Sequence, residues 1–227
     1  LPHAPAATGF ENCTVTLDQD IDLADATLPV TDKSWIPIGG GIPFNSSSIH
    51  SFKGTFNGNG YLIKGLTITS NANTSVGLFG YTEGAQILNL GVELSATGIE
   101  MELQGGYAGA LAGYMTTASS IENCYTTGSK AITIISPTGG TTYVGGIAGK
   151  CDQSNIKNCY STIDITVTGV GGSQVGGIIS STNASITNCL ATGVLEGKTV
   201  GGIAGSGIPT SCLALNPTIK YTTRDGY

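Results

Sequence analysis

Residues 143–149 read YVGGIAG, and this stretch decides the fold because it recurs along the chain. It returns as VGGIIS at residues 175–180 and as VGGIAG at residues 200–205. Looser copies read YAGALAG at residues 107–113 and VGLFG at residues 76–80. Repeats with periods of about 20 to 50 residues are typical of solenoids and related repeat folds.

A second motif, Ile-x-Asn-Cys, follows the glycine-rich copies about 8 to 12 residues further on. It stands at residues 121–124, 156–159 and 186–189, and residues 87–90 carry a variant with leucine in place of cysteine. The cysteines of this series, which ends at Cys212, are 35, 30 and 23 residues apart, so the motifs are constant while the loops vary. A unit this short cannot bury its own apolar face, whereas stacked copies can.

The repeats predict an all-β fold, namely a parallel, right-handed β-helix of about five coils. We expect three strands in each coil, exemplified by residues 144–149, 154–161 and 163–168. In residues 163–168 apolar residues alternate with polar ones, which is the pattern of a strand with one buried face. Equivalent side chains should then stack along the molecule at the strand spacing of about 4.8 Å.

The spacing within the Ile-x-Asn-Cys motif predicts a bend. Isoleucine and cysteine are three residues apart, so a straight strand would point them to opposite faces. If both point inward, the chain must turn between them, and asparagine tolerates left-handed backbone angles better than most residues. We therefore predict a ladder of hydrogen-bonded asparagines at one corner of the coil: Asn89, Asn123, Asn158 and Asn188. The alternative interpretation is that these four are separate, solvent-facing turn residues.

The cysteines of the motif should form a second column, made of Cys124, Cys159, Cys189 and Cys212. Neighbours in such a column lie about 4.8 Å apart, whereas disulfides need about 3.5–4.5 Å between Cβ atoms. We interpret them as buried free thiols that act as small hydrophobic residues. Cys13 and Cys151 lie outside this column and their pairing state is not predicted. The sequence has no Cys-x-x-Cys pair, and its two histidines are His3 and His50, so we predict no metal site.

The composition excludes several classes of protein. Charged residues make up 11% of the 227 residues, against about 25% in an ordinary soluble domain. A net charge of -6 with a single arginine, Arg224, argues against a nucleic-acid partner. No run of about 18 apolar residues exists, so we predict no membrane span. The first ten residues do not form a signal peptide, and a mature chain that has lost one would look the same.

Three segments ahead of the repeats carry a family resemblance. They read DIDL at residues 20–23, WIPIG at residues 35–39 and GTFNGNG at residues 54–60. This order, followed by repeats of the GGIAG kind, resembles the GLUG-motif proteins over about residues 15–205, although that family usually has aspartate where Asn57 stands. The resemblance implies a β-solenoid body and an extracellular or cell-surface location in a bacterium. The family includes adhesin-like chains and chains named immunoglobulin A1 peptidases, but it implies no catalytic centre in the repeats.

We expect one folded domain with three parts. Residues 1–50 form an N-terminal cap with the first strands, residues 51–212 form the GLUG-type β-helix, and residues 213–227 form a C-terminal cap or tail. Caps are expected because an open coil presents unpaired strand edges.

The function that these features favour is a non-catalytic surface or secreted module, adhesin-like or a spacer, that binds host glycans or glycoproteins. Several tyrosines in partial register could stack on sugar rings or could cover the bases of loops: Tyr107, Tyr114, Tyr125, Tyr143 and Tyr160. We predict no catalytic residue and no cofactor, and the oligomeric state is not predicted.

Two alternatives stay open. The first is a carbohydrate-active β-helix enzyme, a lyase or a glycosidase, and a hydrolase of that kind would need two carboxylates at a set separation. The second is an accessory domain of an immunoglobulin A1 protease-like peptidase whose catalytic part lies outside this chain. The His-Glu-x-x-His motif of a zinc peptidase does not occur here.

Overall fold

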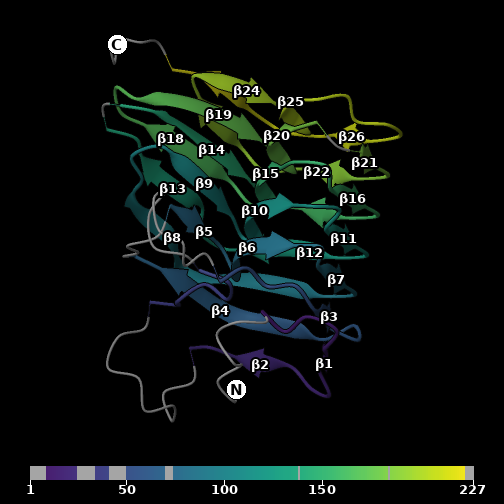
Figure 1. Cartoon of the computed structure of the whole chain (residues 1–227). Helices are drawn as coiled ribbons and strands as arrows, with labels where there is room; N and C mark the ends of the chain where they lie inside the picture. Colours follow the sequence, from purple (N-terminus) through teal and green to yellow (C-terminus); the bar gives the residue numbers. More distant parts are fainter. Residues whose placement is uncertain are drawn as a thin grey trace.

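The computed structural model describes residues 9–24, 34–40, 50–69, 74–137, 139–183 and 185–222. Throughout these residues the chain forms β-strands, turns and bends, with no helix. Every pairing between strands is parallel. The strands wind into a stack of coils, in which β1 and β2 lie at one end and β24 and β26 at the other (Figure 1). The fold is thus an all-β parallel solenoid, as predicted.

The stack starts with two partial coils. The first consists of β1 (Thr14–Thr16) and β2 (Ile21–Asp22), and the second of β3 (Thr55–Asn57) and β4 (Leu62–Ile68). Most of the predicted cap at residues 1–50 lies outside the described residues, but β1 and β2 within it already pair in the sheets of the solenoid.

Four complete coils follow in the described chain. The first contains β5 (Ser75–Val76), β6 (Phe79–Glu83), β7 (Gln86–Leu88) and β8 (Gly91–Glu102). The second contains β9 (Gly106–Gly109), β10 (Ala112–Thr116), β11 (Ser120–Glu122), β12 (Tyr125–Gly128) and β13 (Ile132–Ile135).

The third complete coil contains β14 (Thr141–Gly145), β15 (Ala148–Cys151), β16 (Asn155–Lys157), β17 (Tyr160–Ser161) and β18 (Ile165–Thr168). The fourth contains β19 (Gly172–Gly176), β20 (Ile179–Thr182), β21 (Ser185–Thr187), β22 (Leu190–Ala191) and β23 (Leu195–Gly197). A last coil, with β24 (Thr199–Gly201), β25 (Ala204–Ser206), β26 (Leu213–Ala214) and β27 (Ile219–Tyr221), ends the described chain.

The coils build four sheets, which we name A to D. Sheet A runs β1-β3-β7-β11-β16-β21, sheet C runs β25-β20-β15-β10-β6, and sheet D runs β24-β19-β14-β9-β5. Sheet B runs β26-β22-β17-β12-β8-β13-β18-β23-β27, and β4 and β2 join it through β8. Within one coil the chain visits sheets D, C, A and B in turn.

The number of strands in each coil differs from the prediction. The VGGIAG motif was expected to be one strand, but it divides into β14 and β15, with a corner at Gly146 and Ile147. Residues 154–161 likewise divide into β16 and β17 at the asparagine. A corner is recognised in a sequence where the alternation of buried and exposed side chains breaks. The glycine pair has no side chains, so this break is hidden and the motif resembles one continuous strand.

The core consists of apolar columns that run the length of the stack. One column joins Phe56, Ile87, Ile121, Ile156 and Ile186, and these side chains are at most 4% exposed. A second joins Ile68, Ile99, Ile132, Ile165 and Leu195, and all five are fully buried. Each coil therefore buries its inward side chains against the coils on both sides, which is how short units share one core.

Candidate functional site

The corner between sheets A and B repeats the same backbone conformation in each complete coil. Asn89, Asn123, Asn158 and Asn188 have φ angles of 52°, 55°, 54° and 54°, in the left-handed region. Asparagine reaches this region at a lower energetic cost than other residues with a side chain, glycine apart. The last coil repeats the bend with Ser211 at a φ of 53°.

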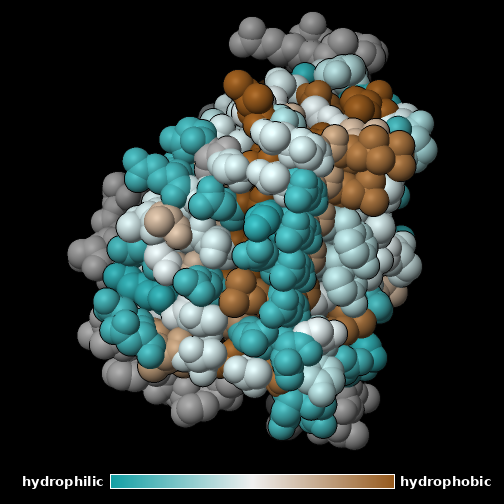
Figure 2. Space-filling view, turned by 90° about the vertical axis from the view of Figure 1, so that its right-hand side faces the viewer, coloured by the Kyte–Doolittle hydropathy of each residue, from teal (hydrophilic) through white to brown (hydrophobic). Residues whose placement is uncertain are grey.

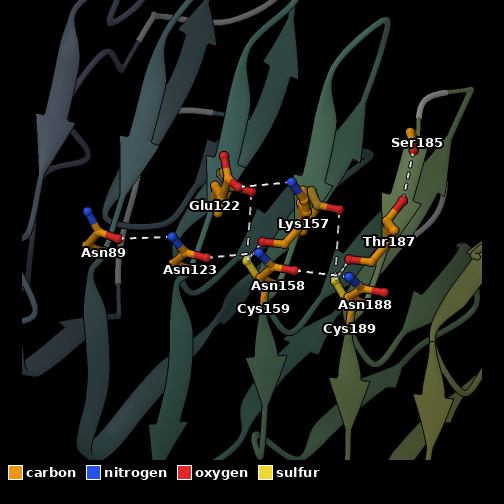
Figure 3. Close-up of polar contacts among 12 residues, drawn as sticks. Asn89, Glu122, Asn123, Lys157, Asn158, Cys159, Ser185, Thr187, Asn188 and Cys189 are labelled. Carbon is orange, nitrogen blue, oxygen red and sulfur yellow. Dashed lines mark hydrogen bonds and ion pairs between the residues drawn. The ribbon is translucent and has the colours of Figure 1, made fainter. Parts of the chain in front are cut away.

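The asparagine side chains at this corner are hydrogen-bonded in series (Figure 3). The Asn123 amide donates to Asn89 at 3.1 Å, Asn158 donates to Asn123 at 3.1 Å, and Asn188 donates to Asn158 at 3.3 Å. Asn89 in turn donates to Asn57 at 3.1 Å, so the series extends one coil further than the motif does. Asn123, Asn158 and Asn188 are nevertheless exposed to solvent. These asparagines thus face the solvent, as in the alternative interpretation, but they are joined in a series and are not separate.

The neighbouring cysteine column lies inside the stack. The thiols of Cys124, Cys159 and Cys189 are buried, that of Cys212 is half-buried, and none forms a disulfide. Each thiol donates to the carbonyl two residues earlier, at 3.1–3.3 Å. A hydrogen bond with the Cys124 thiol, together with burial, raises the pKa of Cys159 to about 12. The pKa values of Cys189 and Cys212 are also raised, so the thiols of Cys159, Cys189 and Cys212 stay protonated at neutral pH.

The two cysteines that the sequence left unplaced have different environments. Cys151 is buried in sheet C, where its thiol contacts the Met115 sulfur at 3.3 Å. Burial raises the pKa of Cys151. Cys13 is exposed in the first coil. Within the described residues no group of three or more histidine, cysteine, aspartate or glutamate side chains is arranged to hold a metal ion.

The corner between sheets D and C brings a different set of side chains together. Its glycines allow close approach of neighbouring strands: a Cβ on Gly149 would lie 2.6 Å from the Ala108 nitrogen, and one on Gly113 would lie 2.5 Å from the Val76 nitrogen. The outward side chains of the two sheets converge as a result. Tyr107 of β9 stacks on Tyr114 of β10, with ring centroids 4.8 Å apart.

We name this group the tyrosine cluster: Tyr81, Tyr107, Tyr114, Tyr143, Lys150 and Asp152. Tyr143 stacks on Tyr107 at 5.6 Å, and Tyr81 meets Tyr114 edge to face at 5.7 Å. The Lys150 ammonium lies 5.9 Å from the Tyr107 ring centre and 5.5 Å from that of Tyr114, within the range of a cation–π contact.

A polar network crosses the same cluster. The Tyr114 hydroxyl donates to the Asp152 carboxylate, and Lys150 forms an ion pair with Asp152 at 3.1 Å. Burial raises the pKa of Tyr114, and the hydrogen bond and negative charge of Asp152 raise it further. Burial also raises the pKa of Tyr107. Both phenols therefore stay protonated and serve as hydrogen-bonding groups rather than as bases.

Glu83 is the carboxylate that could pair with Asp152 in a glycosidase. It is the register partner of Thr116, while Cys151, just before Asp152, is the register partner of Met115. The two carboxylates therefore lie two coils apart along sheet C, with the coil of Thr116 between them. A hydrogen bond from Ser51 at 2.8 Å and the Lys53 ammonium at 3.2 Å lower the pKa of Glu83. A general acid needs a raised pKa, so Glu83, whose pKa is lowered, is unsuited to the role of general acid.

The structure separates the five tyrosines of the sequence analysis into two groups. Tyr107, Tyr114 and Tyr143 belong to the tyrosine cluster, whereas Tyr125 and Tyr160 stack at 5.0 Å on sheet B, beside the asparagine corner. Sequence reasoning missed Tyr81, Lys150 and Asp152. The sequence does contain a signal for Lys150. Tyr143 and Lys150 flank VGGIAG in the same way that Tyr107 and Tyr114 flank AGALAG, so Lys150 occupies the position of Tyr114 one coil later.

The model of the GLUG motif matches residues 140–168, which include β14 to β18 and both corners described above. This segment is a GLUG motif. Its glycine pair forms the D–C corner, and its asparagine forms the A–B corner. A GLUG motif, which the sequence led us to expect over about residues 15–205, is thus matched in the third complete coil of the stack.

Two further comparisons extend the likeness beyond the GLUG motif. Halomucin of Haloquadratum walsbyi (strain DSM 16790 / HBSQ001) is 31% identical over 191 residues, which are 82% of this chain and 2% of Halomucin. A crystal structure at 1.30 Å of a candidate immunoglobulin A1 protease from Bacteroides ovatus superposes with a TM-score of 0.60 and 22% identity. That match covers 88% of this chain and 68% of the other, and it shows a shared fold. In the described parts of our chain no helix is long and apolar enough to cross a membrane.

Proposed function

We propose that this chain is a non-catalytic β-solenoid module of a secreted or cell-surface bacterial protein, and that its tyrosine cluster binds glycan chains. A parallel solenoid supplies a stiff, extended body, which suits an adhesin-like or spacer role. The GLUG motif and the likeness to Halomucin support a place among large extracellular proteins.

The observation that carries the proposal is the convergence of four tyrosines with Lys150 and Asp152 at one corner. Tyrosine combines a rigid apolar ring with a hydrogen-bonding hydroxyl, and sugars present apolar C–H faces beside hydroxyl groups. The ring stack ends at Tyr143, whose register partner in the next coil is Gln174. A sugar ring could therefore extend the stack at Tyr143, with Lys150 and Asp152 available to its hydroxyls.

The test is binding to a panel of purified glycans and mucin glycoproteins, followed by calorimetry on the best ligand. Replacing Lys150→Ala should weaken binding about tenfold, which corresponds to one hydrogen bond to a charged group. Tyr143→Ala removes the ring on which the sugar stacks and should weaken binding by a similar factor. Tyr160→Ala is the matched control, because Tyr160 is also a stacked surface tyrosine but lies on sheet B. Equal losses in all three variants, or no binding by the wild-type chain, would exclude the tyrosine cluster as a glycan site.

A further inference from the structure

The surface beside the tyrosine cluster changes character in the fourth complete coil. In sheet D the register partner of Tyr143 is Gln174, and in sheet C the register partner of Lys150 is Ser181. The stack of rings therefore stops at Tyr143, and polar, non-aromatic side chains continue the same two columns. The D–C corner thus has a step, with tyrosine rings on one side and an amide and a hydroxyl on the other.

The polar side chains beyond this step bring hydrogen-bonding groups next to Tyr143. Gln174 lies against the last coil, where a Cβ on Gly205 would be 2.8 Å from the Gln174 Cγ. Ser181 accepts a hydrogen bond from Ser206 at 3.2 Å, so its own hydroxyl proton can be donated to another acceptor. The face of the Tyr143 ring that is directed to the fourth coil, which we name the open face, therefore adjoins donors and acceptors rather than another ring.

Charge is balanced within the tyrosine cluster. Lys150 is its one cation and Asp152 its one anion, and the two form an ion pair at 3.1 Å. Asp152 also accepts a hydrogen bond from the Tyr114 hydroxyl. A carboxylate or sulfate on a ligand would compete with Asp152 for Lys150 and would be repelled by Asp152 at close range. The cluster is therefore suited to hydroxyl groups rather than to anions.

Positive charge that could attract an anionic ligand is also scarce elsewhere in the described residues. Four further lysines there form ion pairs with carboxylates: Lys53, Lys64, Lys157 and Lys220. Lys198 donates to the Val170 carbonyl at 2.8 Å. The whole chain carries a net charge of -6. Long-range electrostatics therefore oppose the approach of acidic glycans and leave the approach of neutral ones unaffected.

We propose that the tyrosine cluster binds an uncharged sugar residue on the open face of Tyr143, beside Gln174 and Ser181. This inference rests on the proposed glycan binding and names the class of ligand. The apolar face of the sugar packs on the Tyr143 ring, and its hydroxyl groups bond to Gln174 and Ser181. Lys150 and Asp152 remain paired and offer further charge-assisted hydrogen bonds. Sialic acids, uronic acids and sulfated sugars carry a negative charge that Asp152 repels.

The test compares a mucin glycoprotein with the same mucin after sialidase has removed its sialic acids. The wild-type chain should bind the desialylated mucin about tenfold more tightly, measured as dissociation constants by biolayer interferometry. Asp152→Asn keeps an acceptor for Tyr114 but leaves Lys150 without a counter-charge, so this preference should fall about tenfold, the effect of one hydrogen bond to a charged group. Asp164→Asn is the matched control, because it changes the net charge equally at an exposed position just before β18, and it should keep the preference.

A second pair of variants tests where the sugar lies. Gln174→Tyr extends the ring stack by one coil and covers the open face of Tyr143, so it should weaken binding of the desialylated mucin about tenfold or more. Gln86→Tyr is the matched control and should bind like the wild type. Gln86 is an exposed residue of β7 in sheet A, on the flank of the stack where Figure 2 shows a hydrophilic band. Circular dichroism of each variant establishes that it is folded.

The outcomes separate this proposal from glycan binding as such. If neither mucin bound, both the proposed function and the uncharged ligand would be overturned. If the sialylated mucin bound as tightly as the desialylated one, and Tyr143→Ala weakened both, the tyrosine cluster would remain a glycan site but the choice of an uncharged sugar would be wrong. Unchanged binding by Gln174→Tyr would overturn the position on the open face of Tyr143.

Discussion

Asparagine at the A–B corner has two roles that can be separated. Its backbone adopts the left-handed conformation, and its side chain both donates to the coil before and accepts from the coil after. The sequence predicted the bend because isoleucine and cysteine, three residues apart, both had to be buried. The exposure of the corner could not be predicted in the same way, because it depends on the angle at which sheets A and B meet.

Asn158 is the position at which to separate these roles. Asn158→Gly keeps the left-handed backbone and removes the side-chain bonds, so we expect it to lower the free energy of unfolding by about 1 kcal/mol. Asn158→Ala also forces a Cβ into the left-handed region and should cost about 1 kcal/mol more. Urea unfolding of both variants measures the difference. If alanine proved no worse than glycine, backbone conformation would not be what selects asparagine here.

At the scale of the element, the glycine-rich corner explains both a success and a failure of the sequence analysis. The repeat of VGGIAG identified the solenoid. It did not reveal that the motif contains two strands, or that residues on its two sides face each other. Tyr143 and Lys150 are separated by the glycine pair, and their proximity to Tyr107 and Tyr114 depends on a corner that only the folded backbone specifies.

Gly145→Ala tests how tightly this corner is packed. A Cβ at position 145 would lie 2.1 Å from the Ala148 carbonyl oxygen and 2.7 Å from the Ile179 Cα, both backbone atoms. We expect a loss of about 1–3 kcal/mol of stability from this overpacking, measured by thermal unfolding. Gly172→Ala is the control, because the nearest atom there is the Thr141 hydroxyl, at 2.8 Å, which can rotate away. Similar stabilities of the two variants would contradict the packing argument.

At the scale of the whole molecule, stability is distributed along the stack. An inner coil has a partner on both sides, whereas β26 and β27 have one. The sequence predicted the number of coils closely, because each motif marks one coil. It could not predict how the ends are finished, since residues 1–50 and 213–227 carry no repeat from which to infer a register.

Amide hydrogen exchange should therefore show a gradient along the stack. We expect the slowest exchange in the inner strands β11, β12 and β16, and the fastest in β1, β2, β26 and β27, because end coils open without disturbing the rest. Mass spectrometry of protease fragments resolves these regions. Uniform protection from one end to the other would indicate instead that all coils unfold as a single cooperative unit.

The direction of the hydrogen bonds has a mechanical consequence. The bonds between coils, from backbone amides and from the asparagine series alike, point along the axis of the stack. A pull applied between the two ends loads the coil-to-coil interfaces in series, so the weakest interface yields first while the others hold. The molecule would then lengthen in steps, one coil at a time. A surface protein built from such units would absorb the drag of flowing liquid as extension rather than break.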